Sequence, residues 1–326
     1  MDVLALAGEV IDGRRLKRDE DRAFFKTCDL DALTEGADRI RKHFSGDRVD
    51  LCSIISGKSG NCSENCRFCA QSAHNHTACE VYGLLDYDTV YAEAKANEKE
   101  GVDRFAIVIS GHHPSCADFE KIVEIYERLH RELKISLCAS LGFLTQEQFD
   151  RLYEAGVRRY HNNIETSRRF FPSVCTTHTF DDKIANIKRA RAAGLTVCSG
   201  GIIGMGESMD DRIDMAFDLS ELEIKSIPIN SLLPIPGTPL ENLPTLTREE
   251  ILRTVAIFRY INPESNIRIA AGRLLLGENG RKAFESGASS AITGNMLTTT
   301  GSTIRRDREM FLDMGRTVIG IQRNTH

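Results

Sequence analysis

The sequence contains no tryptophan and only 8 prolines among its 326 residues, and it has no long apolar run. A helix that spans a membrane needs about 18 or more apolar residues in succession, so we expect no membrane partner. The N-terminal stretch MDVLALAGEVIDGRRLKRDED becomes charged too early for the apolar part of a secretory signal. We therefore expect a cytoplasmic protein.

An excess of positive charge is also missing. The chain has 42 Lys and Arg against 47 Asp and Glu, which gives a formal net charge of -5. This balance argues against the broad basic surface of a nucleic-acid-binding protein. The one basic run, RRLKR at 14 to 18, is interpreted as the solvated face of a helical arm over about residues 15 to 43.

The cysteines carry the first chemical signal. Because disulfides are rare in a reducing compartment, clustered thiols are interpreted as metal ligands or catalytic groups. The stretch SGKSGNCSENCRFCAQS places Cys62, Cys66 and Cys69 within eight positions. Structural zinc needs a fourth ligand close by, which His74 or His76 would supply, so a zinc site is one alternative.

An iron-sulfur cube is the other alternative for this triplet. A cube held by three cysteines leaves one iron open to a cosubstrate. The spacing, with Phe68 between the last two cysteines, resembles the CxxxCxΦC motif of the radical S-adenosylmethionine enzymes. That resemblance implies a 4Fe-4S cluster that binds S-adenosylmethionine and cleaves it to a 5'-deoxyadenosyl radical, which takes hydrogen from unactivated carbon.

Short apolar segments alternate along the chain with amphipathic helical patterns. Eight strands separated by helices predict a parallel (β/α)8 TIM barrel with the active-site loops at the carboxyl ends of its strands. We divide the chain into an N-terminal helical extension, 1–45, a barrel, 46–316, and a C-terminal tail, 317–326. The eight strands are expected at 50–55, 104–110, 135–140, 159–165, 195–202, 226–232, 267–271 and 289–293.

Three further cysteines lie in the middle of expected strands. Cys52, Cys138 and Cys198 belong to strands one, three and five, and Arg268 belongs to strand seven. Inward side chains of alternate barrel strands share a layer, so these four residues are expected to meet. They are either small buried thiols with the arginine turned outward, or the site of a second iron-sulfur cluster with Arg268 as ligand or cationic neighbour.

Longer motifs resemble the biotin synthase family, from about residue 30 to about residue 315. They are CSENCRFCAQS, RYHNNIETS, VCSGGIIGMGES, SIPINSL, GTPLE, IRIAAGR and LTTTG. The resemblance implies an enzyme that inserts sulfur into dethiobiotin at C6 and C9, consuming two molecules of S-adenosylmethionine and taking the sulfur from an auxiliary cluster. It also implies a flavodoxin or ferredoxin type of reductant and a homodimer.

The same resemblance assigns roles to individual residues. Cys62, Cys66 and Cys69 match the ligands of the 4Fe-4S cluster. The family more often has Asp where Glu165 stands, and Lys183 occupies a position where an Arg can hold the methionine carboxylate. The resemblance implies cosubstrate contacts for Phe68, Asn163, Glu165 and Lys183, and substrate contacts for Asn163, Asn230, Thr298 and Thr299.

One position departs from the family pattern. The best-known biotin synthases bind a 2Fe-2S cluster through three barrel cysteines and an arginine, and Ala106 stands where the first of those cysteines is expected. Cys138, Cys198 and Arg268 match the other three ligands, and Cys52 stands where that pattern has Ser. We infer that Cys52 replaces the lost ligand. The auxiliary cluster is then either 2Fe-2S or a four-iron cluster with an exogenous sulfide.

The remaining cysteines and histidines carry weaker signals. Cys116 and Cys175, expected in loops after strands two and four, are interpreted as surface or packing residues, and Cys28 and Cys79 as structural. Four histidines near the expected barrel mouth are interpreted as hydrogen-bonding residues: His112, His113, His161 and His178.

Other functions stay open at this point. A radical enzyme with the same barrel, of the hydrogenase maturase or methylornithine synthase type, is one alternative. A non-catalytic iron-sulfur sensor is another.

Overall fold

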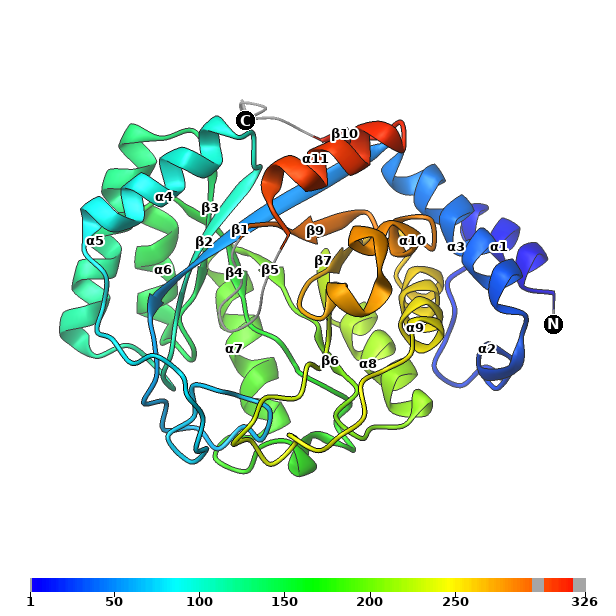
Figure 1. Cartoon of the computed structure of the whole chain (residues 1–326), viewed down its shortest axis with the longest axis horizontal. Helices are drawn as coiled ribbons and strands as arrows, with labels where there is room; N and C mark the ends of the chain where they lie inside the picture. Colours follow the sequence, from blue (N-terminus) through cyan, green and yellow to red (C-terminus); the bar gives the residue numbers. More distant parts are fainter. Residues whose placement is uncertain (1, 295–301, 319–326) are drawn as a thin grey trace.

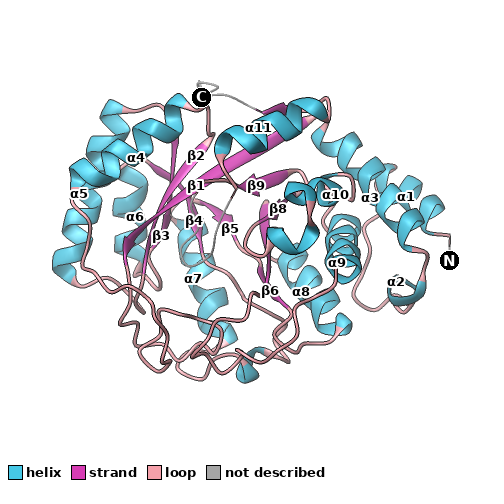
Figure 2. Ribbon diagram, viewed as in Figure 1, coloured by secondary structure: helices cyan, strands magenta, loops and turns pink. Residues whose placement is uncertain are grey.

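The computed structural model describes residues 2–294 and 302–318. Its centre is a barrel of parallel strands, and the helices form an outer layer around it (Figures 1 and 2). The strands are hydrogen-bonded in the order β10, β1, β2, β3, β4, β5, β7, β8 and β9, and an additional β1–β9 pairing closes the barrel. All pairings between strands are parallel, which confirms the expected (β/α)8 class.

The strands agree closely with the expected segments. They are β1 (Arg48–Lys58), β2 (Arg104–Ile109), β3 (Ser136–Ser140), β4 (Val157–His161), β5 (Thr196–Cys198), β6 (Gly201–Ile203), β7 (Ser226–Ser231), β8 (Asn266–Ile269), β9 (Ser290–Ile292) and β10 (Thr317–Val318). The expected fifth strand is broken into β5 and β6, and both pieces pair with β7.

The helices of the outer layer lie between these strands. They are α1 (Val3–Ile11), α2 (Phe24–Thr27), α3 (Leu30–Ser45), α4 (Tyr87–Lys99), α5 (Cys116–Glu132), α6 (Gln146–Glu154), α7 (Phe180–Ala192), α8 (Met209–Glu221), α9 (Arg248–Ile261), α10 (Arg281–Phe284) and α11 (Ile304–Asp313). Short 3-10 turns occur at η1 (Phe171–Ser173), η2 (Arg273–Leu276) and η3 (Glu278–Gly280). Within the described ranges, no helix is both long enough and apolar enough to cross a membrane.

The N-terminal arm differs in part from its expectation. A helix begins already at Val3, and most of 12–23 is irregular, because Gly13 (φ +109°) ends α1 in a conformation that favours glycine. The basic run is therefore not a helix face. Arg18 donates instead to Asp218 at 2.6 Å and to Glu221 at 2.9 Å on α8.

The described end of the chain joins the barrel. Strand β10 pairs with the start of β1, where Arg48 faces Thr317. The helices before the barrel pack on it as well, because the Tyr260 hydroxyl of α9 donates to the carbonyl of Val3 at 2.8 Å. The division at residues 45 and 316 stays a prediction.

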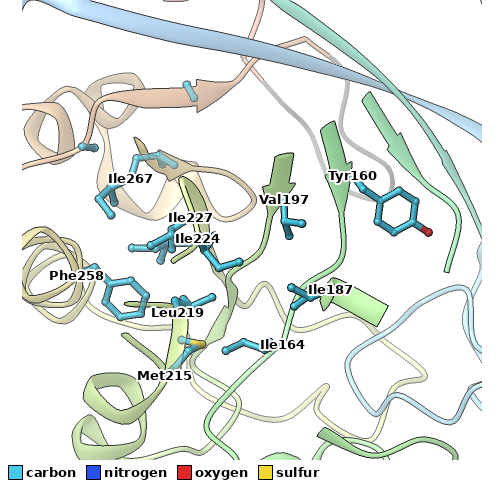
Figure 3. Close-up of a cluster of buried hydrophobic side chains, with 14 of the residues drawn as sticks. Tyr160, Ile164, Ile187, Val197, Met215, Leu219, Ile224, Ile227, Phe258 and Ile267 are labelled. Carbon is cyan, nitrogen blue, oxygen red and sulfur yellow. The ribbon is translucent and has the colours of Figure 1, made fainter. Parts of the chain in front are cut away.

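The hydrophobic core lies between the strands and the helices. Figure 3 shows Ile227 and Ile267 from neighbouring strands packed toward Leu219 of α8 and Phe258 of α9. All four are fully or almost fully buried. Since this outer shell supplies the apolar contacts, the side chains that point into the barrel are free to be polar and to serve a site.

Candidate active site in the barrel

One cavity of about 320 Å³ occupies the barrel interior. Its walls contain residues from both groups of cysteines that the sequence singles out. The lining includes Cys69 and Phe68 from the loop after β1, the strand residues Cys52, Cys138, Cys198 and Arg268, and the polar residues Asn163, Glu165 and Asn230. The structure thus brings together most of the expected site in a single space.

The loop of the cysteine triplet is held by its own backbone and by one amide. The Cys62 N–H donates to the Gln71 carbonyl at 2.9 Å. The Asn75 side chain donates to the carbonyls of Cys66, at 3.2 Å, and Cys69, at 2.8 Å. Burial raises the pKa of Cys69 to about 11, so a positive centre is needed to hold it as a thiolate.

His74, one of the two histidines offered by the zinc alternative, has another contact. His74 Nε2 lies 3.0 Å from the Ser63 carbonyl oxygen. That ring nitrogen is therefore occupied by the loop backbone. The contact leaves Nδ1 of His74 available, since metal-binding histidines often donate their other nitrogen to a backbone carbonyl. Among the described residues, however, the side chains close enough to share one ion include neither His74 nor His76.

The inner thiols lie among positive charges. Cys138 and Cys198 are 3% and 8% exposed. A hydrogen bond with Cys52, supported by Arg159 and Arg104, lowers the pKa of Cys138 to about 6. Burial raises the pKa of Cys198, but the nearby His161 and Arg268 outweigh it and bring the value to about 7. The hydrogen bond with Cys138 also raises the pKa of Cys52, so the Cys52–Cys138 pair releases one proton easily and the second only when a metal binds.

Arg268 is buried with a partner. Its guanidinium pairs with Asp50 and donates to the Ala291 carbonyl at 2.8 Å. Asp50 also accepts from Arg104 Nε at 3.0 Å. The ion pair fixes the position of Arg268 in the cavity wall and favours the alternative in which Arg268 is a cationic neighbour of the second cluster. The role of Arg268 as a ligand stays a prediction.

Arg159 of β4 is a site residue that the sequence analysis missed. Its side chain is 9% exposed, and Nε has no hydrogen-bond partner among the residues that the structure describes. It lines the cavity together with His161 and Asn163 of the same segment. The signal was present, because alternate residues of a strand share a face and an inward Asn163 implies an inward Arg159.

The expected cosubstrate residues lie where β4 ends. Asn163 Oδ1 accepts from the Gly200 N–H at 3.0 Å. Glu165 lines the cavity with a φ of +69°, a strained value for a residue other than glycine, and its backbone pairs with Gly201. Strain of this kind is typical of functional positions.

Lys183 lies on α7 and is 8% exposed. Its ammonium group is 5.2 Å from the centre of the Phe143 ring. It has no carboxylate partner among residues 2–294 and 302–318. A buried, unpaired cation close to the triplet loop is suited to an anionic ligand.

Of the expected substrate residues, Asn230 lies in the cavity wall. Its amide donates to the Gly201 carbonyl at 3.1 Å and accepts from the Ala271 N–H at 3.2 Å. Two bonds to backbone fix the orientation of this amide between β6 and β8. Thr298 and Thr299 lie outside the described residues.

The comparisons with known proteins identify the family. The model of the Radical SAM superfamily matches residues 58–219, and that of the Biotin and Thiamin Synthesis associated domain matches residues 228–317. Biotin synthase of Alkaliphilus metalliredigens is 55% identical over 97% of this chain and 99% of its own length. Biotin synthase of Clostridium beijerinckii is 54% identical over 95% and 98%. The chain belongs to the biotin synthase family.

Solved structures confirm the barrel. Methylornithine synthase has a TM-score of 0.82 at 20% identity, covering 96% of this chain and 97% of that one. The FeFe-hydrogenase maturase HydG from Carboxydothermus hydrogenoformans has a TM-score of 0.79 at 18% identity, covering 96% and 78%. At such identities the likeness concerns the fold alone. The biotin synthase relatives, more than twice as similar, decide against these two enzyme types and confirm the expectation of an enzyme.

The residues present fit two iron-sulfur centres of the biotin synthase family. The outer triplet offers three thiols in a loop with fixed backbone. The inner group offers three thiols beside the unpaired Nε of Arg159 and the cation of Arg268, a donor set suited to an anionic cluster. Ala106 lines the cavity beside Cys138 and has no ligand atom, so Cys52 is the third inner thiol available.

The other cysteines are distributed as follows. Cys116 is exposed and begins α5, not a loop as expected. Cys28 is half-buried and contacts Arg253, and Cys79 lies 3.6 Å from the Ser59 hydroxyl. Cys175, in contrast, is buried beside Cys66 and His178, where a hydrogen bond with Cys66 lowers the pKa of Cys175.

Proposed function

We propose that this chain inserts sulfur into dethiobiotin at C6 and C9 to form biotin, using S-adenosylmethionine and an auxiliary iron-sulfur cluster as the sulfur source. The observation that carries the proposal is that Cys69 of the outer triplet and the three inner thiols line one cavity. A substrate held between them is within reach of both a radical and a sulfur atom. Membership in the biotin synthase family supports the same conclusion.

The outer centre would be held by Cys62, Cys66 and Cys69. When bound, a 4Fe-4S cluster with S-adenosylmethionine supplies an electron and, from it, a 5'-deoxyadenosyl radical. The chain holds the cosubstrate beside this centre. Lys183 offers an unpaired ammonium to the methionine carboxylate, and Glu165 and Asn163 offer polar atoms to its amino group and ribose.

The substrate would lie between the two centres. Asn230, fixed by two backbone hydrogen bonds, presents its amide to the ureido ring of dethiobiotin. Apolar residues of the same cavity exclude water from a reactive radical. They include Ile202, Leu232, Leu233 and Ile235. Thr298 and Thr299 are proposed to bind the carboxylate tail.

The inner centre would be held by Cys52, Cys138 and Cys198, with Arg268 as ligand or charge partner. Arg104, Arg159 and Arg268 surround these thiols, and Asp50 is a buried carboxylate that offsets them. A four-iron cluster with three thiolates and an added sulfide carries more negative charge than a two-iron cluster with three thiolates. The surplus of guanidinium groups therefore supports the four-iron form.

The iron content of the inner centre can be measured directly. Anomalous scattering at the iron edge should show four irons between Cys52, Cys138 and Cys198. Two irons at this place would contradict the four-iron form and leave the 2Fe-2S form.

Three further features belong to the proposal. The reductant is of the flavodoxin or ferredoxin type, the assembly is a homodimer, and the enzyme acts in the cytoplasm. Sedimentation of the anaerobic holoenzyme measures the assembly, and a monomer at micromolar concentration would contradict the dimer.

Two variants separate the roles of the two centres. Cys66→Ala should abolish formation of 5'-deoxyadenosine, because it removes a ligand of the outer cluster. Cys52→Ser should retain S-adenosylmethionine cleavage and lose biotin formation, because it removes a ligand of the sulfur source. The exposed Cys116→Ser is the matched control and should retain both products. Biotin formation by Cys52→Ser would overturn the assignment of Cys52.

A further inference from the structure

A second group of metal-binding side chains lies beside the outer triplet. The Sγ atoms of Cys66 and Cys175 and a ring nitrogen of His178 all lie within 4.8 Å of one another. Cys175 and His178 are 4% and 7% exposed. Only Cys66 of this group has a role in the proposed reaction, and no role is assigned to the other two.

The distances suit a single small ion. Cys175 Sγ lies 3.3 Å from His178 Nδ1. A tetrahedral zinc ion, with bonds of about 2.3 Å to sulfur and about 2.0 Å to nitrogen, separates these two ligands by about 3.5 Å. Glu64 contacts His178 and also pairs with His112 at 2.9 Å, so it orients the ring and the fourth position of the ion is left to solvent.

The group is also held in place by its surroundings. The Asn65 amide oxygen and the Thr177 hydroxyl lie 3.3 Å from Cys175 Sγ, and Thr177 donates to Glu64 at 2.6 Å. The His178 ring packs edge-on against Phe143 and Phe171. Such outer contacts orient metal ligands and limit the cost of assembling them.

We propose that Cys66, Cys175 and His178 form a site for one divalent transition-metal ion in the chain that has not yet received its outer cluster. Two thiolates and an imidazole, with a water molecule as fourth ligand, form a donor set that zinc and ferrous iron both accept. The ion binds thiolates and a neutral imidazole, so any proton that these groups hold is released on binding. Because Cys66 cannot serve both centres, the ion and the cluster exclude each other, and a bound zinc ion withholds Cys66 from cluster assembly.

Cobalt(II) is the probe for this site, since its visible spectrum reports tetrahedral thiolate coordination. The full chain, reduced and freed of metal, is titrated in a background that removes all three inner thiols, with Cys52→Ser, Cys138→Ser and Cys198→Ser. One equivalent should bind with thiolate-to-metal charge transfer. Cys175→Ser should weaken binding at least about tenfold. Cys62→Ser and Cys69→Ser are the matched controls and should retain the affinity of the background chain.

The opposite pattern overturns the proposal. If Cys62→Ser and Cys69→Ser weaken binding and Cys175→Ser does not, the ion belongs to the triplet alone. His178→Gln provides the same comparison where Cys175→Ser fails to fold, and near-ultraviolet circular dichroism reports folding for every variant.

A second measurement tests the competition with the cluster. One equivalent of zinc should slow the growth of the outer 4Fe-4S absorbance during anaerobic reconstitution, and Cys175→Ser should lose this effect. Equal slowing in both chains would contradict exclusion at Cys66. Ferrous iron in place of zinc distinguishes the two natural ions, because only iron should speed reconstitution. None of these readouts depends on biotin formation, so they stand or fall separately from the proposed reaction.

Discussion

At the scale of single residues, the cavity separates groups with partners from groups without them. Arg104 and Arg268 both have Asp50, whereas Nε of Arg159 has no partner in the described part of the chain. A buried cation without a partner is costly unless a ligand supplies the opposite charge. We therefore expect the negative charge of the inner cluster to be bound beside Arg159.

This interpretation gives a prediction for Arg159→Met, which keeps the length of the side chain and removes its charge. We expect at least about half of the inner iron and acid-labile sulfide to be lost on reconstitution, while the outer cluster still cleaves S-adenosylmethionine. Iron and sulfide analysis with Mössbauer spectroscopy measures both centres. Arg159→Lys, which restores a cation, is the control and should recover most of the inner iron. Full inner occupancy in Arg159→Met would show that the charge is not needed.

Asp103, near the start of β2, gives a prediction about pH. Burial raises the pKa of Asp103 to about 7, and the nearby Asp50 adds to this effect. The unfolded value is about 4, so the folded chain holds the proton more tightly. The protonated Asp103 contributes fully to the free energy of unfolding below a pH of about 4, and this contribution is lost as the pH rises through about 7.

Asp103→Asn keeps an oxygen that can accept from the Leu51 N–H, now at 2.8 Å, and has no charge to bury. Its advantage over the parent chain in free energy of unfolding should be larger at pH 8.5 than at pH 6, by on the order of 1 to 2 kcal/mol. Anaerobic urea unfolding at both values measures the difference. Asp19→Asn, at an exposed position, should show no such change. A gain that is the same at both pH values would be evidence against the raised pKa.

At the scale of elements, the helices follow from local sequence and the break in the fifth strand does not. Four helices begin with a capping box whose residues are adjacent in sequence, at Thr145, Thr179, Ser208 and Thr247. The break between β5 and β6 depends on another strand instead. A Cβ atom at Gly200 would lie 1.9 Å from the Pro228 carbonyl oxygen of β7.

Gly200→Ala should therefore destabilise the barrel by at least about 2 kcal/mol, because backbone must move to admit the methyl group. Gly8→Ala is the matched control. Gly8 lies at an exposed position of α1 with no atom within 4 Å of the added Cβ, so alanine should be neutral or stabilise by about 0.5 to 1 kcal/mol. Urea unfolding compares the two. Equal stability of both variants would show that β5 and β7 can separate without cost.

At the scale of the whole molecule, a buried ion pair attaches the C-terminal helix to the barrel. Arg273, after β8, donates to both carboxylate oxygens of Asp307 on α11, at 2.6 and 3.1 Å. Asp307 is fully buried and also accepts from Asn279 at 2.6 Å. Removing one partner leaves the other charge buried and unpaired.

Asp307→Ala should cost about 3 to 5 kcal/mol and loosen α11. Arg305→Ala, on the same helix, removes an exposed pair with Glu309 and should change stability by less than about 0.5 kcal/mol. Thermal unfolding together with hydrogen exchange of α11 measures both effects. If Asp307→Ala unfolds at the parent temperature with α11 still protected, the pair does not hold the helix.

The sequence by itself determined the class of fold and the two groups of thiols. Alternating strands and helices specify the barrel, because each element carries its own periodicity and caps. Neighbouring side chains of a strand point to opposite sides, and this alternation also places Cys52, Cys138 and Cys198 on the inner faces of their three strands.

Only the tertiary structure decided which distant groups meet. Cys66 and Cys175 are far apart in sequence, and their contact depends on how two loops pack at the barrel mouth. The unpaired Arg159, the ion pair of Arg268 with Asp50, and the strand break beside Pro228 likewise depend on neighbours that local sequence does not specify. The physical reason is that burial, charge pairing and backbone clearance arise from closure of the barrel, which joins its first strand to its last.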